Sequence, residues 1–111
     1  FQLVQAMLAD SRAEALAARC MVLDTARRRD RGAAIAAEAA CCKMFASEMV
    51  GRVADRIVQI FGGAGYIADN GIERFYRDVR LFRLYEGTTQ IQQLVIARHM
   101  LQEGRAAAGQ G

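Results

Sequence analysis

Two long runs of residues carry small or apolar side chains at alternating intervals of four and three, the repeat of one face of an α-helix. In the first run, which starts at Phe1, these positions are Val4, Leu8, Ser11, Ala15, Ala18 and Val22. In the second run they are Ile35, Ala39, Cys42, Ala46, Met49, Val53, Ile57 and Ile60. No stretch shows sustained strand-like alternation, and no proline interrupts either run. The pattern therefore predicts an all-α fold.

Glycines divide the pattern into four predicted helices. The first helix fades near Asp30 and ends at Gly32, and the second spans residues 33–61 and stops in the glycine cluster at 62–65. A third, shorter helix follows residues 69–71, and a fourth begins near Thr89. We predict a four-helix up-and-down bundle over residues 1–103, followed by a flexible tail at 104–111. Because the helical pattern is already running at Phe1, we expect the chain to be cut from a longer protein.

Charge and cysteine content narrow the possible partners. The net charge of +3 is too small to indicate nucleic acid, and no apolar run is long enough to span a bilayer. The basic run Arg27–Arg31 is either a charged loop at a helix end or a site for a phosphate-bearing ligand or partner. Three cysteines without metal-ligand spacing favour buried thiols in a reducing compartment, with no disulfide framework and no metal site.

One carboxylate is placed as a candidate acid or base. Glu86 lies between Tyr85 and Gly87, just before the last predicted helix, and we expect Thr89 to cap that helix in a capping box with Gln92. Such a carboxylate is either a partner of the helix dipole or an acid/base residue on a rigid mount. The only histidine, His99, is predicted to contact carbonyls near the helix end.

The segment at 59–66 leaves a second question open. Its glycines follow a helix, so one possibility is a simple C-cap and turn. The other is a ligand-binding surface, where Gln59 and backbone without side chains contact a flat or phosphorylated ligand. No strand precedes it, which excludes the dinucleotide fingerprint of doubly wound folds.

Three motifs together carry a resemblance to a known family. They are FQLVQAMLAD at 1–10, QIFGGAGY at 59–66 and YRDVRLFRLYEGTTQIQQLVIAR at 76–98. In this order they resemble the C-terminal helical domain of the acyl-CoA dehydrogenase family, of the short-, medium- or branched-chain type. The resemblance implies a flavoenzyme with FAD that oxidises acyl-CoA thioesters to trans-2-enoyl-CoA. It also implies a homo-oligomer, a dimer or a tetramer built from dimers, that passes electrons to an electron-transferring flavoprotein in the bacterial cytoplasm or the mitochondrial matrix.

The same resemblance assigns roles to residues. Glu86 corresponds to the catalytic base that removes the α-proton while hydride passes to FAD, and Gly87 to a substrate contact. The remaining matched positions are expected to contact FAD, and residues 59–63 are expected to do so across a dimer interface. The FAD-contacting positions are Gln2, Gln59, Ile60, Phe61, Gly62, Gly63, Thr88, Thr89 and Gln90.

Two alternatives stay open at this point. A relative on the same scaffold could act on another substrate, or the chain could be a non-catalytic helical domain that mediates assembly. Because the rest of the acyl pocket is expected outside these residues, we expect the chain alone to be inactive.

Overall fold

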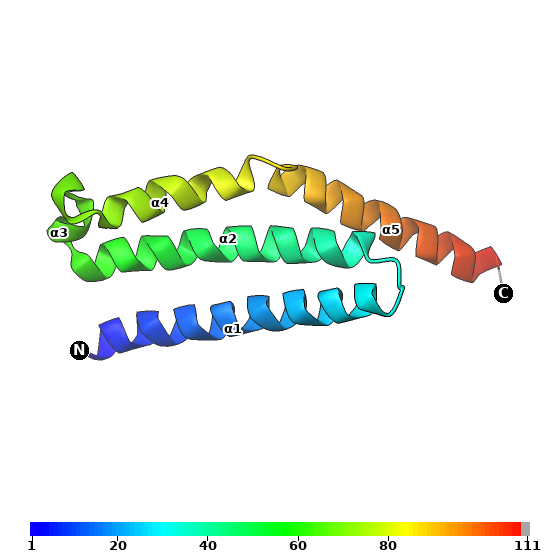
Figure 1. Ribbon diagram of the computed structural model, residues 1–111, viewed down its shortest axis with the longest axis horizontal. Coiled ribbons are helices and arrows are strands. Elements are labelled where there is room, and N and C mark those ends of the chain that lie inside the picture. Colours follow the sequence, from blue (N-terminus) through cyan, green and yellow to red (C-terminus); the bar gives the residue numbers. More distant parts are fainter. Residues whose placement is uncertain (110–111) are drawn as a thin grey trace.

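The computed structural model describes residues 1–109 and is helical along most of that length (Figure 1). The α-helices are α1 (Gln2–Asp30), α2 (Ala36–Phe61), α3 (Gly63–Tyr66), α4 (Ile72–Arg80) and α5 (Thr89–Gly109). Two 3-10 turns, η1 (Ala68–Asn70) and η2 (Leu81–Arg83), flank α4. The all-α prediction is confirmed, and the four predicted helices correspond to α1, α2, α4 and α5.

Helix α2 is the centre of the arrangement. It packs against α1 and also against α4 and α5, which follow one another along its length (Figure 1). The direction of the chain reverses from α1 to α2 and again from α2 to α4, and α5 continues in the direction of α4. The break between α4 and α5 therefore lies over the middle of α2, and residues 84–88 occupy it.

Glycines mark the helix ends as predicted. Gly32 and Gly62 have φ angles of 85° and 62°, values that glycine adopts without a side-chain clash. Gly71, with φ of 74°, precedes α4 in the same way. The tail predicted from Gly104 is helical as far as Gly109, because α5 continues without a break. Residues 110–111 of that tail lie outside the described residues, and its flexibility stays a prediction.

The face of α1 that meets α2 differs from the predicted stripe. Ala18 and Thr25 are buried, and Ser11 and Glu14 receive hydrogen bonds from Arg56 of α2. By contrast, the predicted stripe residues Leu8 and Val22 are 55% and 47% exposed. The predicted stripe is correct at Val4, Ser11 and Ala18 but wrong by one residue at Leu8, Ala15 and Val22. The less exposed positions are instead Met7, Glu14 and Met21, because spacing alone does not fix which of two adjacent residues faces the partner helix.

The exposed apolar surface of the described chain is unusually large. Exposed residues include Leu3, Leu16, Tyr66, Phe75, Leu94 and Leu101, and no large side chain among residues 1–109 is fully buried. The radius of gyration is 17.8 Å, whereas a compact chain of this length would have about 13 Å. The described chain is elongated, with extents of 59 × 27 × 25 Å, and its exposed apolar side chains leave surface for other protein parts to cover. Within residues 1–109, no helix is long and apolar enough to cross a membrane.

An ion-pair cluster links α1 to α2. The guanidinium of Arg56 donates to both carboxylate oxygens of Glu14, at 2.9 and 3.1 Å, and Arg52 donates to the same carboxylate at 3.2 Å. The hydrogen bond from Arg56 is the main cause that holds the pKa of Glu14 below its ordinary value. The ionised carboxylate is thus favoured in the folded state.

Replacing Glu14 with glutamine is expected to lower stability at neutral pH and to have little effect in acid. A carboxyl whose pKa is lower in the folded state stabilises the fold above its unfolded pKa of about 4.3. That contribution disappears as the pH falls through the lower, folded pKa. Thermal unfolding midpoints of the wild type and Glu14→Gln, measured between about pH 7 and about pH 3, should converge at the acidic end. A pH-independent difference would contradict the prediction.

Gly65 lies where the turn of α3 comes close to the end of α2. A Cβ atom added there would lie 2.8 Å from the Val58 carbonyl oxygen and 2.9 Å from the Phe61 Cβ. Gly65→Ala should therefore destabilise the protein by about 1–3 kcal/mol, because the end of α2 or the turn of α3 must move. Gly63→Ala is the matched control, since a Cβ added at Gly63 would meet nothing within 4 Å. Equal melting temperatures for the two variants would contradict this account.

Candidate functional site

The loop between η2 and α5 carries Glu86 on an unusual backbone. Glu86 has φ of 54°, the one positive value at a residue other than glycine within residues 1–109, and Gly87 follows with φ of 86°. A side chain in this left-handed region costs on the order of 1–2 kcal/mol, because its Cβ crowds the following carbonyl. Such a conformation persists only where neighbouring contacts fix it, and it is typical of functional sites.

Side chains from two helices fix this left-handed pair. Lys43 of α2 donates from Nζ to the carbonyl oxygen of Gly87 at 2.6 Å. Gln92 of α5 donates from Nε2 to the carbonyls of Glu86 and Gly87 at 3.2 and 3.4 Å. Both carbonyl groups are therefore held from outside the loop, while the carboxylate of Glu86 remains exposed.

The cap of α5 differs from the prediction by one residue. Thr88, not Thr89, caps the helix, since its Oγ1 accepts a hydrogen bond of 3.2 Å from the amide of Ile91. Thr89 is instead buried and donates to Glu48 Oε1 at 2.7 Å. The predicted capping box is wrong because α2 engages the Thr89 hydroxyl, and the Gln92 amide turns back to the loop carbonyls.

Glu48 joins the two ends of the loop. Its Oε1 accepts the hydroxyl of Thr89 at the start of α5, and its Oε2 lies 3.3 Å from Nη1 of Arg83 at the end of η2. Gly51, one turn along α2, leaves room for the Arg83 guanidinium, which would lie 3.6 Å from a Cβ added at that glycine. One carboxylate on α2 thus fixes the positions where the loop begins and ends.

A hollow lies beside Glu86. Its volume is about 510 Å³, and Lys43 and Glu86 line it together with mainly apolar side chains, among them Ala46, Met49, Val50, Phe82 and Tyr85. The rings of Phe82 and Tyr85 stack with centroids 5.8 Å apart and planes 18° from parallel. The arrangement places a carboxylate next to an apolar surface, the combination that a base acting on a weakly acidic C–H group requires.

The predicted cofactor residues fall into two groups that the chain does not bring together. Residues 88–90 lie at the start of α5, over the middle of α2, whereas residues 59–63 lie at the far end of α2 (Figure 1). Along α2, Glu48 and Phe61 are separated by about 20 Å. Gln2, at the start of α1, lies at the same end of the molecule as residues 59–63. Gln59, Gly62 and Gly63 are exposed there, with open space where a Cβ of either glycine would be.

Other candidates from the sequence have structural partners. His99 Nδ1 lies 2.9 Å from the carbonyl of Val95, one turn back within α5 and well before its end. In the basic run, Arg28 pairs with Asp24 at 2.9 Å and approaches Glu38 at 3.9 Å. The prediction of buried cysteines is wrong for Cys20, which is exposed on α1. Cys41 and Cys42 are half-buried, and all three thiols are free.

The loop contacts from α2 were not predicted from the sequence. Lys43 and Glu48 precede Glu86 by many residues, and no local pattern connects them to it. One signal was present in the chain, since Lys43 is the single lysine among fifteen basic residues. Within residues 1–109, no three His, Cys, Asp or Glu side chains gather in a way that could hold a metal ion.

Comparisons with known proteins identify relatives over nearly the whole chain. The family described as "Acyl-CoA dehydrogenase, C-terminal domain" matches residues 1–101. A Bacillus subtilis protein named "Probable acyl-CoA dehydrogenase YngJ" is 46% identical over 91% of this chain and 27% of its own length. The caffeyl-CoA reductase-Etf complex subunit CarC of Acetobacterium woodii is 40% identical over 93% of this chain and 27% of its own length.

Solved structures with a similar fold come from the same family. The structure of butyryl-CoA dehydrogenase from Megasphaera elsdenii superposes with a TM-score of 0.87 at 36% identity, covering 91% of this chain and 26% of that one. The chain thus spans about a quarter of the length of these relatives.

Proposed function

The chain belongs to the acyl-CoA dehydrogenase family as its C-terminal domain, and we propose that it supplies the catalytic base, Glu86, of an FAD-dependent acyl-CoA dehydrogenase. The proposed reaction removes hydrogen from Cα and Cβ of an acyl-CoA thioester and yields the trans-2-enoyl-CoA. The observation that carries the proposal is the Glu86 carboxylate, held on a fixed left-handed backbone beside an apolar hollow.

The residues of this chain account for the proton-transfer half of the reaction. An α-proton of a thioester is only weakly acidic, so the base must lie within hydrogen-bond reach of it. Glu86 accepts that proton on its carboxylate, and the apolar side chains of the hollow would help to exclude competing water once bound substrate and other parts of the enzyme cover them. Gly87 carries no side chain next to the base, which lets the thioester approach the backbone. FAD, when bound, supplies the electron-accepting chemistry that takes the β-hydrogen as hydride.

The exposed residues at two places suit contacts with FAD. Gln59 offers a free amide, and Gly62 and Gly63 expose backbone with open space where a Cβ would be. Ile60, Phe61 and Gln2 lie at the same end. At the other place, Thr88 and Gln90 begin α5, and Thr89 contributes through its backbone since Glu48 engages its hydroxyl. Two subunits that each contribute one group would form complete sites in a dimer, and two dimers would form a tetramer.

The surface of the chain agrees with such an assembly. Large apolar side chains remain exposed on α1, α4 and α5, and the other domains and neighbouring subunits of the proposed full-length enzyme would cover them. We further propose electron-transferring flavoprotein as the electron acceptor, since one relative is a subunit of a complex named for it. Free cysteines suit a reducing compartment, the cytoplasm of a bacterium or the mitochondrial matrix.

One alternative has a specific observation in its favour. The relative from Acetobacterium woodii is named a reductase of caffeyl-CoA, so this scaffold also serves the reduction of an unsaturated CoA ester. In that direction, protonated Glu86 would donate a proton to Cα. The second alternative is a non-catalytic domain that mediates assembly. The left-handed backbone of Glu86 argues against it, because such a strained conformation is typical of functional sites.

The deciding experiment uses the full-length protein. Purified protein should show flavin absorbance that bleaches under anaerobic conditions on addition of butyryl-, octanoyl-, palmitoyl- or isovaleryl-CoA, with free CoA as the control. Oxidation of chemically reduced protein by an enoyl-CoA, without bleaching by any saturated thioester, would favour the reductase. A colourless protein that still assembles would favour the non-catalytic domain and contradict the proposal.

A further inference from the structure

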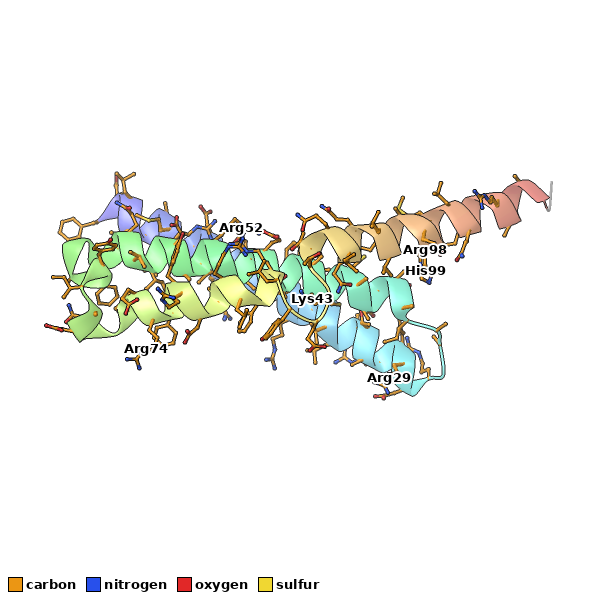
Figure 2. The ribbon with its side chains drawn as sticks, turned by 90° about the horizontal axis from the view of Figure 1, so that it is seen from above. Arg29, Lys43, Arg52, Arg74, Arg98 and His99 are labelled. Carbon is orange, nitrogen blue, oxygen red and sulfur yellow. The ribbon has the colours of Figure 1, made fainter. Side chains whose placement is uncertain are left out.

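Lys43 occupies a position that no other basic residue shares. It is the only lysine in the sequence, and the other fourteen of the fifteen basic residues are arginines. It lies on the central helix α2, half-buried, beside the loop that connects α4 to α5 (Figure 2). Its Nζ donates to the carbonyl of Gly87 at 2.6 Å, a short distance for a hydrogen bond to a carbonyl oxygen.

The contact acts on the residue that follows the proposed base. The peptide between Glu86 and Gly87 has positive φ on both sides, so the direction of the Glu86 side chain depends on what holds this pair. Gln92 also donates to these carbonyls, but at the longer distances of 3.2 and 3.4 Å, and from the helix that the loop itself leads into. Lys43 is the donor that ties the pair to a different helix.

An ammonium suits this position better than a guanidinium does. Its charge is compact and its three donors rotate freely, whereas an arginine presents a planar fork that needs more space. Lys43 also lines the hollow beside Glu86. Its side chain therefore forms part of the wall of the hollow and also holds the loop that carries Glu86. Glu48 fixes the two ends of the same loop, and Lys43 fixes its middle.

We propose that Lys43 is a positioning residue, which holds the Gly87 carbonyl and thereby aims the Glu86 carboxylate at the α-carbon of the substrate. This inference rests on the proposed function, since it requires Glu86 to be the base. It predicts a specific defect, in which proton abstraction slows while substrate and FAD still bind. A displacement of the base by about 1 Å is enough to reduce the rate by up to about 100-fold.

The test compares Lys43→Met with the wild type in the full-length FAD-loaded protein. Methionine keeps an unbranched apolar stem, so the wall of the hollow is preserved while the charged donor is lost. We expect the rate of flavin reduction by acyl-CoA to fall about 10- to 100-fold, with KM, FAD content and the melting temperature nearly unchanged. Proton exchange provides a second readout. Exchange with D2O of the α-hydrogens of acetyl-CoA, which has no β-hydrogen, should slow by a similar factor in NMR spectra.

Arg74→Met is the control. It also removes a cation, but Arg74 is exposed on α4 and lies far from Lys43 and the loop of Glu86 (Figure 2). Both rates should stay at the wild-type level in that variant. If Lys43→Met does not fold, Lys43→Gln is the second variant, with the same expected loss, because its neutral amide has a shorter reach.

The outcomes separate this inference from the proposed function. Wild-type rates in Lys43→Met, or a rate loss that only follows loss of FAD or of stability, would overturn the positioning role. If Glu86→Gln slows both reactions and Lys43→Met does not, only the role of Lys43 is wrong. If Glu86→Gln itself leaves exchange and flavin reduction unchanged, the proposed function is wrong as well.

Discussion

Replacing Glu86 with glutamine in the full-length protein is expected to abolish flavin reduction by acyl-CoA while FAD stays bound. Glutamine has the same shape, but its amide cannot accept the α-proton. The loop should keep its conformation, because Lys43 and Gln92 hold the backbone carbonyls of residues 86 and 87, which the substitution leaves in place. A general base contributes roughly 10²–10⁴-fold, and we expect a loss near the upper end.

Anaerobic stopped-flow absorbance at the flavin band measures this loss directly. Glu103→Gln is the matched control, since Glu103 is an exposed carboxylate near the far end of α5 and its loss should leave the rate unchanged. The flavin-to-protein ratio of each variant shows whether FAD is retained. Normal bleaching in Glu86→Gln would rule out Glu86 as the base.

The second large effect is expected from Gly87→Ala. At φ of 86° an alanine is strained, and its Cβ would lie 2.6 Å from Nε2 of Gln92. The Gln92 amide can move away, but it then loses its hydrogen bonds to the carbonyls of Glu86 and Gly87. Relaxation of the loop would displace the base, and a shift of about 1 Å corresponds to a rate loss of roughly 100-fold.

The measurement pairs flavin reduction with thermal unfolding. Left-handed strain of about 1–2 kcal/mol should also lower the melting temperature by a few degrees. Gly104→Ala is the control, because Gly104 lies within α5 with open space where a Cβ would be, and alanine favours the helix there. A Gly87→Ala protein as active as Gly104→Ala would show that the thioester and the loop tolerate a side chain at residue 87.

Local signals in the sequence predicted the helices well. Glycines at 32, 62 and 71 ended or preceded helices as expected, because a positive φ is a local property of the residue itself. In α2 the predicted positions other than Ala39 are buried or half-buried. The buried residues Ala40, Ser47 and Ala54 lie off the predicted stripe, since α2 is central and packs against neighbours on several sides. In α1 the same spacing was correct only at Val4, Ser11 and Ala18. Leu8 and Val22 are exposed, and the polar Glu14 meets α2, because apolar periodicity does not reveal which surface covers it.

At the site, the sequence selected Glu86 but not its support. The sequence alone shows that Glu86 lies between Tyr85 and Gly87, just before a helix. Which threonine caps that helix, Thr88 or Thr89, depends on the hydrogen bond between Thr89 and Glu48. That contact joins residues far apart in the sequence, as does the one between Lys43 and Gly87. Neither has a local spacing from which it could be predicted.

The sequence by itself determined the helical class, the helix ends and the identity of the exposed carboxylate, because each follows from backbone preferences of nearby residues. Only the tertiary structure decided that α4 and α5 lie end to end along α2, with the loop of Glu86 over the middle of that helix. The physical reason is that Gln92, close in sequence, is only one of the two donors that hold the left-handed pair at residues 86 and 87. The other donor, Lys43, lies on a distant helix, and only folding brings it within hydrogen-bond distance of Gly87.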